Sequence, residues 1–429
     1  MTVPPELGIL ADDLTGATDT GLQFAKCGRR TSVCLSWAAN PPCDVLVFDT
    51  DSRGIPADEA RKRAVFATHA LRGFGAQRFY KKIDSTGRGN LGAEIEGMLE
   101  TVGADLALVC PAFPPLARTV RDGQIFIRGT PLDQSEFVRD PKWPATTASL
   151  EAILHRQSRL PVGFVPLSEV RSGPSAIRER LRRSVDGGDR LIVADAEVPM
   201  DLRNLSETVR QAHGAILPVG SAGLAEWLVA WFERPARPPS ALTLPPGPIL
   251  VVAGTSSLTG NVQIARLVEE GARFVWLSPE RTLRETPITV REAATELTGR
   301  LRESACVAVG LADPRQGLSE LRSAIQAPGG DPAMIGGRLV QALGEVVGRA
   351  LETVAPAALI LTGGDTARAV CLSLGATSLE VRWEAAPGIP ISLLQGGRWD
   401  GLPVVTKAGG FGRPDSLAQV VDVLERLRK

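Results

Sequence analysis

Short apolar runs alternate with helix-length segments along almost the whole chain of 429 residues. Most of these runs are short enough for a single strand, and each is followed by a polar or glycine-bearing turn. Repeated strand–helix units favour parallel strands with helices on both faces of the sheet. The sequence therefore predicts an α/β protein with mostly parallel, doubly wound sheets. The expected strands include residues 7–11, 31–37, 45–49, 78–82, 104–109, 191–194, 216–219, 249–253 and 358–361.

The chain is too long for one ordinary hydrophobic core, so two domains are expected. Residues 235–248 contain six prolines in fourteen positions. Such a segment is typical of a linker, because proline stiffens the chain and cannot continue a helix. We therefore expect an N-terminal domain over residues 1–236, a linker over 237–248 and a C-terminal domain over 249–429.

Composition excludes several classes of function. The formal net charge is zero, so no basic field recruits nucleic acid or an acidic membrane. No apolar run approaches the roughly 20 residues of a spanning helix, and the N-terminus lacks a signal-peptide pattern. The six cysteines form no CxxC pair, which favours buried thiols in a reducing cytoplasm. The three histidines argue against a histidine-based triad or metal site.

The stretch at residues 81–90, KKIDSTGRGN, carries the densest mixture of functional groups. It lies where an expected strand passes into an expected helix. Cations and helix N-termini hold anions, while carboxylates order hydroxyl groups, so a small polyhydroxylated anion would suit this loop. A solvated surface loop is the plainer interpretation. The candidate substrate-binding residues are Lys82, Asp84, Ser85, Arg88 and Asn90.

Asp12 and Asp13 follow the first expected strand and precede a helix. Either Asp13 or Thr15 could simply cap that helix. Neighbouring strand residues point to opposite faces, so one aspartate should face the site while the other is structural. Both are candidate catalytic residues, and the sequence does not rank them. A phosphoaspartate enzyme of the haloacid dehalogenase type is rejected, because it needs Asp at positions i and i+2 and Leu14 occupies the second of these.

Three glycine-bearing turns follow apolar strands in the second domain, at residues 254–257, 363–366 and 407–412. Ligands of open α/β sheets bind beyond the carboxyl ends of the strands, and glycine lets the backbone approach phosphate. Neither the dinucleotide fingerprint nor the Walker loop is present. A polar site in one domain and a phosphate site in the other predict a two-domain phosphotransferase with its active site in the inter-domain cleft. A hydrolase or a phosphosugar-binding protein would share this composition.

Seven segments together resemble the four-carbon acid sugar kinases, which phosphorylate tetronates and related acids at O4. They lie in order along nearly the whole chain, and the combination is specific although each piece alone is not. The segments are DDLTGATDT at 12–20, KKIDSTGRGN at 81–90, PAFP at 111–114, VADAE at 193–197, GSAGLA at 220–225, GGDTA at 363–367 and KAGGFG at 407–412.

The resemblance implies an ATP-dependent sugar-acid kinase with an acid-sugar N-terminal domain and a nucleotide-binding C-terminal domain. Mg²⁺ would accompany the nucleotide, and no protein metal ligand is assigned. No nucleic acid or membrane partner is expected, and a homo-oligomer is left open. The positions that match the ATP site of the family are Ser256, Gly363, Gly364, Asp365, Thr366, Lys407, Gly409 and Gly410.

Two positions depart from the family pattern. Gly87 stands where the family usually has Leu, and residues 254–257 replace a GSCS-like turn. The first departure lies in the substrate loop, so it bears on the identity of the acid more than on the reaction. A kinase for a related branched or oxo sugar acid and a non-catalytic sensor of a sugar acid and a nucleotide are the alternatives.

Overall fold

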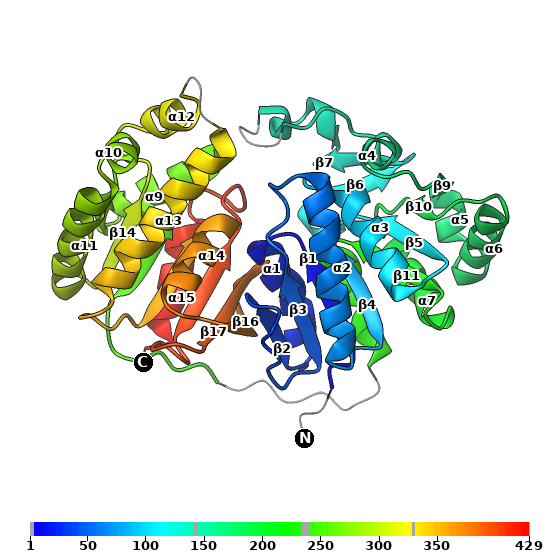
Figure 1. Cartoon of the computed structure of the whole chain (residues 1–429), viewed down its shortest axis with the longest axis horizontal. Helices are drawn as coiled ribbons and strands as arrows, with labels where there is room; N and C mark the ends of the chain where they lie inside the picture. Colours follow the sequence, from blue (N-terminus) through cyan, green and yellow to red (C-terminus); the bar gives the residue numbers. More distant parts are fainter. Residues whose placement is uncertain (1–3, 140–143, 233–240, 255, 328–330, 429) are drawn as a thin grey trace. The chain divides into compact units, whose positions relative to one another are not determined.

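The computed structural model describes residues 4–139, 144–232, 241–254, 256–327 and 331–428. The chain forms two compact units, residues 1–237 and 238–429 (Figure 1). Among the helices of the described residues, none combines the length and the apolar character that crossing a bilayer requires.

The main sheet of the first unit is entirely parallel. Successive strands leave the sheet into helices, as the alternating pattern predicts. Its strands lie in the order β2 (Thr31–Cys34), β3 (Val45–Asp49), β1 (Leu7–Ala11), β4 (Arg78–Lys82), β11 (Ile216–Gly220), β5 (Leu106–Cys110), β10 (Leu191–Ala194) and β9 (Val162–Val165). Strand β2 is shorter than expected, because the chain bends at Leu35.

The helices of this unit form two packed groups. In one, α2 packs against α3 and α3 against α4; in the other, α1 packs against α8, α8 against α7 and α7 against α6. Figure 1 shows α2 and α3 together on the near face of the sheet. The helices are α1 (Leu14–Ala25), α2 (Ala57–Gly73), α3 (Leu91–Val102), α4 (Leu150–Gln157), α5 (Leu167–Arg171), α6 (Pro174–Asp186), α7 (Pro199–Gln211) and α8 (Ala222–Leu228).

A small antiparallel sheet, β6 (Arg118–Arg121), β7 (Gln124–Ile127) and β8 (Thr130–Pro131), is inserted after β5. The sequence pair Asp122-Gly123, typical of a two-residue hairpin turn, joins β6 to β7, and both residues have positive φ, of 50° and 68°. Their backbone N–H groups donate to the buried carboxylate of Asp195, at 3.0 and 2.9 Å. Asp195 follows β10, so this carboxylate ties the hairpin to the main sheet.

The sheet of the second unit has a parallel part and an antiparallel edge. Strands β13, β14, β12, β15 and β18 are parallel neighbours, whereas β17 pairs antiparallel with β18 and with β16. The order is β13 (Arg273–Trp276), β14 (Cys306–Gly310), β12 (Ile249–Ala253), β15 (Ala358–Thr362), β18 (Pro403–Lys407), β17 (Ile389–Gln395) and β16 (Ser378–Ala386).

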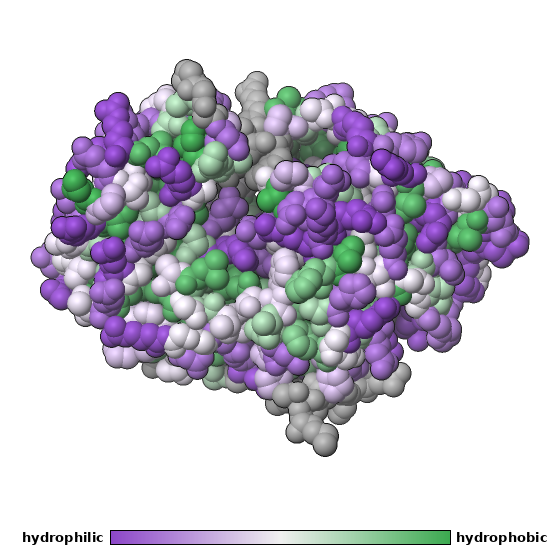
Figure 2. Space-filling model, viewed as in Figure 1, coloured by the Kyte–Doolittle hydropathy of each residue, from purple (hydrophilic) through white to green (hydrophobic). Residues whose placement is uncertain are grey.

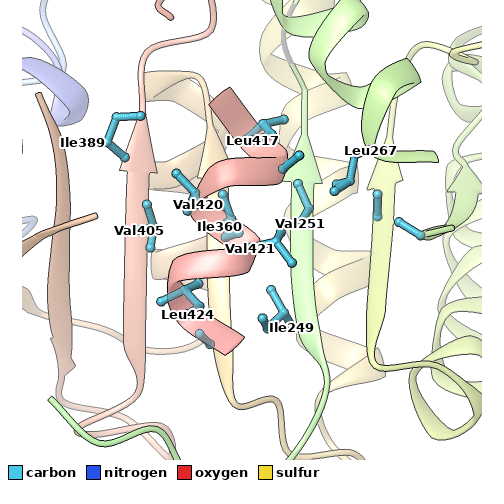
Figure 3. Close-up of a cluster of buried hydrophobic side chains, with 14 of the residues drawn as sticks. Ile249, Val251, Leu267, Ile360, Ile389, Val405, Leu417, Val420, Val421 and Leu424 are labelled. Carbon is cyan, nitrogen blue, oxygen red and sulfur yellow. The ribbon is translucent and has the colours of Figure 1, made fainter. Parts of the chain in front are cut away.

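Helix α15 covers one face of this sheet with an apolar stripe. Leu417, Val420, Val421 and Leu424 are buried against residues of β12, β15 and β18 (Figure 3). Helix α13 packs against both α11 and α14 in a second group. The helices are α9 (Leu258–Glu269), α10 (Pro279–Arg284), α11 (Thr286–Glu303), α12 (Ser319–Ile325), α13 (Pro332–Ala350), α14 (Gly364–Ser373) and α15 (Ser416–Arg426).

The face of the molecule drawn in Figure 2 is mostly hydrophilic. Figure 2 shows purple polar residues over much of the visible face of each unit, with apolar residues in small groups. Large exposed apolar side chains such as Phe66, Met200 and Ile288 come from different helices. Four cysteines are buried as predicted, whereas Cys27 is exposed and Cys306 is partly exposed.

Candidate active site

Three neighbouring strands of the first unit end at the same edge of the sheet. Asp12 follows β1, Arg53 lies in the loop after β3, and Asp84 follows β4. Ala11 at the end of β1 lies opposite Asp49 at the end of β3. The parallel register therefore brings the three loops together, although they are far apart in the sequence.

The guanidinium of Arg53 links the carboxylates at this edge. Its Nε and Nη2 atoms donate to the two oxygens of Asp12 at 2.6 and 2.9 Å. Nη2 also donates to Asp13 at 2.7 Å, and Nη1 lies 3.3 Å from Asp84. Burial would lower the pKa of Arg53, but these three carboxylates raise it well above its usual value. The network therefore favours the charged forms of Arg53, Asp12 and Asp84.

Asp12 is almost completely buried, at 3% exposure. Burial alone would raise its pKa, but Arg53, Lys81 and Lys82 outweigh burial and hold the pKa below its usual value. The carboxylate is therefore ionised near neutral pH. A carboxylate with a lowered pKa is a weak base, so it is better suited to orienting a hydroxyl group than to removing its proton.

Asp13 caps α1, which is one of the two alternatives that the sequence left open. Its Oδ1 atom accepts the backbone N–H of Gly16 at 3.0 Å, and Oδ2 accepts the hydroxyl of Thr15 at 2.6 Å. Because Asp13 also accepts from Arg53, the cap ties the start of the helix to the charged network. The sequence alternative that Thr15 itself caps the helix is not what the structure shows.

The two lysines of the central stretch have different environments. Lys81 is fully buried, and its Nζ atom pairs with Glu94 at 2.7 Å. Lys82 is nearly buried, and its Nζ lies 2.7 Å from the point that a Cβ on Gly16 would occupy. Within the part of the chain that the structure describes, Lys82 forms no ion pair. Alternation along β4 thus separates a structural lysine from one that faces the start of α1.

The loop after β4 folds around Asp84. This carboxylate accepts from the backbone and hydroxyl of Thr86 at 2.7 and 2.6 Å, and from Nε and Nη2 of Arg88 at 2.9 and 2.6 Å. Burial would raise the pKa of Asp84, but Arg88, Arg53 and Lys82 lower it well below its usual value. Ser85 accepts a hydrogen bond from Arg118, which lies on β6.

Asn90 faces the loop after β3. Its Nδ2 atom donates to the carbonyl oxygens of Ser52 and Ile55, both at 2.9 Å. The side-chain nitrogen of Asn90, a predicted substrate-binding residue, is therefore hydrogen-bonded to the backbone. These bonds position the segment that carries Arg53.

The candidate residues chosen from the sequence did not include two arginines of the site, Arg53 and Arg118. Arg53 is the last residue of a polar segment, residues 49–53, at the end of an expected strand. Its position could therefore have indicated a role in the site. Arg118 lies in the hairpin insertion, and only the folded chain brings it to Ser85.

The three glycine-bearing turns of the second unit also meet at one sheet edge. Ala253 at the end of β12 lies opposite Thr362 at the end of β15, and Thr362 lies opposite Lys407 at the end of β18. Gly363 opens α14 with a φ of 100°, and its N–H donates to the carbonyl of Lys407 at 2.8 Å. Ser257 caps α9. The predicted Gly254–Ser257 turn includes residue 255, which lies outside the described residues.

Close packing joins the first two turns. A Cβ on Gly254 would lie 2.4 Å from the hydroxyl oxygen of Thr366, so only glycine fits there without rearrangement. Thr366 is buried, whereas the neighbouring Asp365 is exposed. Gly363, Gly364, Gly409 and Ser256 are partly exposed and Gly410 is exposed, so the backbone of these turns can be reached by a ligand.

Lys407 is buried at 1% exposure, and its Nζ donates to the carbonyl of Ala408 at 2.9 Å. Burial lowers the pKa of this lysine to about 7. The following loop is held by Gln263, whose Nε2 donates to the carbonyls of Phe411 and Arg413 at 3.0 and 2.7 Å. A buried lysine that can take up a proton, beside exposed glycines, is chemically suited to a phosphate group.

The described residues contain no cluster of three or more His, Cys, Asp or Glu side chains that could hold a metal ion. Mg²⁺ commonly uses one or two carboxylates together with phosphate oxygens of a nucleotide. Asp365 supplies one carboxylate in the second turn, which fits an ion that arrives with a nucleotide. Thr366 adds a hydroxyl group beside it.

Comparison with known proteins decides the family. Residues 7–228 match the family model described as a sugar-binding N-terminal domain, and residues 250–417 match that of a nucleotide-binding C-terminal domain. A D-threonate kinase of Salmonella typhimurium is 35% identical, with 98% of both chains covered. The chain belongs to the four-carbon acid sugar kinase family.

Other members of the four-carbon acid sugar kinase family match over similar lengths. A D-erythronate kinase of Heliobacterium modesticaldum is 32% identical, covering 97% of this chain and 96% of its own. A 3-oxo-tetronate kinase of Pseudomonas fluorescens is 31% identical, covering 98% and 97%. A solved structure from Salmonella typhimurium, described as a tRNA synthase, superposes with a TM-score of 0.80 at 26% identity and 98% coverage of both chains.

These findings confirm the family prediction, the α/β fold class and the assignment as a kinase of a four-carbon sugar acid. The roles of individual residues, the domain boundaries and Mg²⁺ stay predictions. So do the inter-domain location of the active site, the cytoplasmic location and the homo-oligomer.

Proposed function

We propose that the protein transfers the γ-phosphoryl group of ATP to O4 of a tetronate or a 3-oxo-tetronate. The observation that carries this proposal is the full-length match to kinases named for D-threonate, D-erythronate and 3-oxo-tetronate. The two sheet edges support it, because one gathers paired carboxylates and cations and the other gathers glycine-bearing turns with a buried lysine.

In the first unit, Asp12 and Asp13 orient the attacking hydroxyl group. Arg53 already holds both carboxylates in place, so these side chains lose little further conformational freedom when the hydroxyl group binds. Lys82 and Arg88 attract the carboxylate of the acid, and Asp84, Ser85 and Asn90 order its other hydroxyls. The contacts already made by Asp84 and Asn90 leave them fewer free atoms for this purpose.

In the second unit, ATP binds at Ser256, Gly363, Gly364, Asp365, Thr366, Lys407, Gly409 and Gly410. The exposed backbone of the turns would receive the phosphates, and Lys407 would neutralise part of their charge. A Mg²⁺ ion that arrives with ATP would supply positive charge to offset that of the transferring phosphate. Asp365 is the residue best placed by its chemistry to meet that ion.

The reaction forms a bond between O4 and the γ-phosphorus and breaks the bond from that phosphorus to the β,γ-bridging oxygen. ADP leaves with the bonding electron pair, and the O4 proton passes to solvent or to a carboxylate. Phosphoryl transfer depends mainly on positioning and charge neutralisation. The lowered pKa of Asp12 agrees with an orienting role for that carboxylate.

The test is ADP release from Mg·ATP with D- and L-threonate, D- and L-erythronate, 3-oxo-tetronates and branched analogues. We expect one of the four-carbon acids to stimulate ADP release well above the others. Stimulation only by a branched acid would move the substrate class to the related-acid alternative. ATP binding by calorimetry with no stimulation by any acid would contradict the kinase proposal and support a sensor.

A further inference from the structure

Arg118 is a cation at the sugar-acid site that the family motifs do not include. It lies at the start of β6, in the hairpin insertion, and its Nη1 atom donates to the hydroxyl of Ser85. Its backbone pairs with Phe113, and Asp195 holds the turn of the same hairpin. The guanidinium is therefore carried by a well-anchored element.

The partners of Arg118 are neutral. Besides Ser85, its guanidinium lies 6.0 Å from the ring centroid of Phe137. Arg118 forms no ion pair with any residue that the structure describes. Arg53 and Arg88 differ, because both bind carboxylates at the same sheet edge.

Arg88 is already largely occupied. Its Nε and Nη2 atoms both bind Asp84, so this edge of the guanidinium is used, and Arg88 would attract a ligand carboxylate mainly through its charge. The Arg88 guanidinium also lies 5.6 Å from the ring centroid of Phe137. The guanidinium groups of Arg88 and Arg118 thus share one aromatic ring, and among the described residues only Arg88 has a carboxylate partner.

Four cations gather around the loop after β4, and Arg118 is the one arginine among them that has no carboxylate within ion-pair distance among the described residues. Arg53, Lys82, Arg88 and Arg118 supply four positive charges, while Asp12, Asp13 and Asp84 supply three negative charges. Lys81 and Glu94 neutralise each other and do not change the balance. The carboxylates of Asp19 and Glu136 also act on Arg118, although neither forms an ion pair with it, and Glu136 pairs with Arg128.

We infer that Arg118 binds the carboxylate of the sugar-acid substrate, with Ser85 and Phe137 holding its guanidinium in place. This inference rests on the proposed function and adds a specificity-determining residue to it. A guanidinium presents two parallel N–H donors to a carboxylate, and stacking on an aromatic ring restricts its orientation. The hairpin insertion would then select acids over neutral sugars.

The electrostatics of Arg118 agree with this role. Burial is the main cause that lowers the pKa of the Arg118 guanidinium, and the charge of Arg88 lowers it further. The charges of Asp84, Asp19 and Glu136 raise this pKa but do not outweigh burial. The side chain stays charged, since an arginine is protonated at all ordinary pH values. A bound carboxylate would compensate both the burial and the nearby positive charge.

Arg118→Gln tests the inference, with Arg121→Gln as the matched control. Arg121 lies on the same strand, is about half exposed and contacts the ring of Phe126 at 4.6 Å. We expect Arg118→Gln to raise the KM for the best sugar acid by about 10- to 100-fold, as loss of a charge-assisted contact does. The KM for ATP should not change, and Arg121→Gln should match the wild type in both constants.

A neutral substrate analogue separates carboxylate binding from a general effect on the loop. The amide of the same acid keeps its hydroxyls and lacks the charge. The wild type should prefer the acid to the amide, and Arg118→Gln should lose most of that preference. Arg118→Lys, which restores the charge without the fork of donors, should recover part of it.

The results distinguish this inference from the proposed function. No activity of the wild type with any acid would overturn the proposed function. An active wild type with an unchanged KM in Arg118→Gln would overturn the inference alone. An equal loss of activity towards acid and amide would also overturn it, because that result indicates a structural role, and a melting curve for each variant checks that it is folded.

Discussion

Asp12 and Arg53 are 41 residues apart in the chain, yet their side chains form a two-point ion pair. Such pairs are stronger than single contacts, and here Arg53 also holds Asp13 and Asp84. Leaving a buried charge without its partner is costly, so the members of this network depend on one another. At the scale of single residues, the charged side chains of the site therefore stabilise one another as a single network.

Replacing Asp12 by Asn tests the proposed orienting carboxylate. We expect turnover with the best sugar acid to fall by about 10²- to 10⁴-fold, since the charge that orients the hydroxyl group is removed. ATP affinity, measured by calorimetry, should stay at the wild-type value. Turnover equal to that of the wild type would remove Asp12 from the mechanism.

The matched variant is Asp13→Asn. Asparagine caps helices about as well as aspartate, so α1 should keep its first turn. A loss of turnover in this variant would therefore report on chemistry and not on helix stability. Comparing the two variants ranks the two aspartates, which the sequence does not.

Because Lys407 is buried, we predict that the protein takes up a proton when it binds ATP. Its pKa of about 7 lies below the ordinary lysine value, so the free protein carries this lysine mostly neutral at pH 8. Phosphate favours the charged form and raises the pKa, so binding at pH 8 should take up about one proton, and at pH 6 almost none. Calorimetry in buffers of different ionisation enthalpy measures this number.

Two variants control that measurement. Lys407→Met should abolish the proton uptake and weaken ATP binding, whereas Lys62→Met, at an exposed position of α2, should change neither. Uptake that persists in Lys407→Met would assign the proton to another group.

At the scale of elements, the loop after β4, which we propose binds the substrate, depends on the glycine at position 87. Gly87 has a φ of 69°, and a Cβ there would lie 3.0 Å from Ile153 and 3.3 Å from Ile125. The left-handed conformation disfavours other residues, and the neighbouring isoleucines fill the space. A leucine at this position would need a different path for residues 84–88.

Gly87→Ala and Gly103→Ala separate backbone strain from packing. Gly103 follows α3 with a similar φ of 73° and has nothing within 4 Å of its would-be Cβ. We expect Gly103→Ala to lower the free energy of unfolding by about 1 kcal/mol, from strain alone. Gly87→Ala should cost more and should raise the KM for the sugar acid, because the loop shifts.

Chemical denaturation and steady-state kinetics check both variants. Equal losses of stability, with an unchanged KM in Gly87→Ala, would show that the contacts of Gly87 with Ile125 and Ile153 are unimportant.

At the scale of the whole molecule, each unit has its own sheet, helices and buried core. The core of the second unit includes Ile249, Val251, Ile360, Val405 and Leu417 (Figure 3). Chains with two such units often unfold in more than one step. Ligands that bind different units should then stabilise different steps.

Differential scanning calorimetry tests this expectation. We expect two transitions, one raised by Mg·ATP and the other by the best sugar acid. A ligand at 100 times its Kd adds about 2.7 kcal/mol to the stability of the unit that binds it. Lys407→Met should reduce the shift of the transition that Mg·ATP raises and leave the shift caused by the sugar acid unchanged. One transition that both ligands raise equally would show that the units unfold together.

Much of the molecule could be predicted from the sequence, because the deciding signals are local. Apolar runs with the length of strands located β1, β3 and β4 within a residue or two, and the Asp-Gly pair located the hairpin of β6 and β7. Strand β2 was placed too long, and the antiparallel pairing of β16 and β17 was not predicted. Pairing direction depends on distant strands, so a local pattern does not contain it.

The sequence by itself determined the family, the α/β class and the turns that end the strands, since these depend on neighbouring residues and on motifs in order. Only the tertiary structure decided that Lys81 binds Glu94 while Lys82 faces α1, and that Arg53 and Arg118 join the site. The physical reason is that strand order and register determine which side chains meet. Arg118 is 33 residues from Ser85 in the chain, and nothing in either local segment indicates their contact.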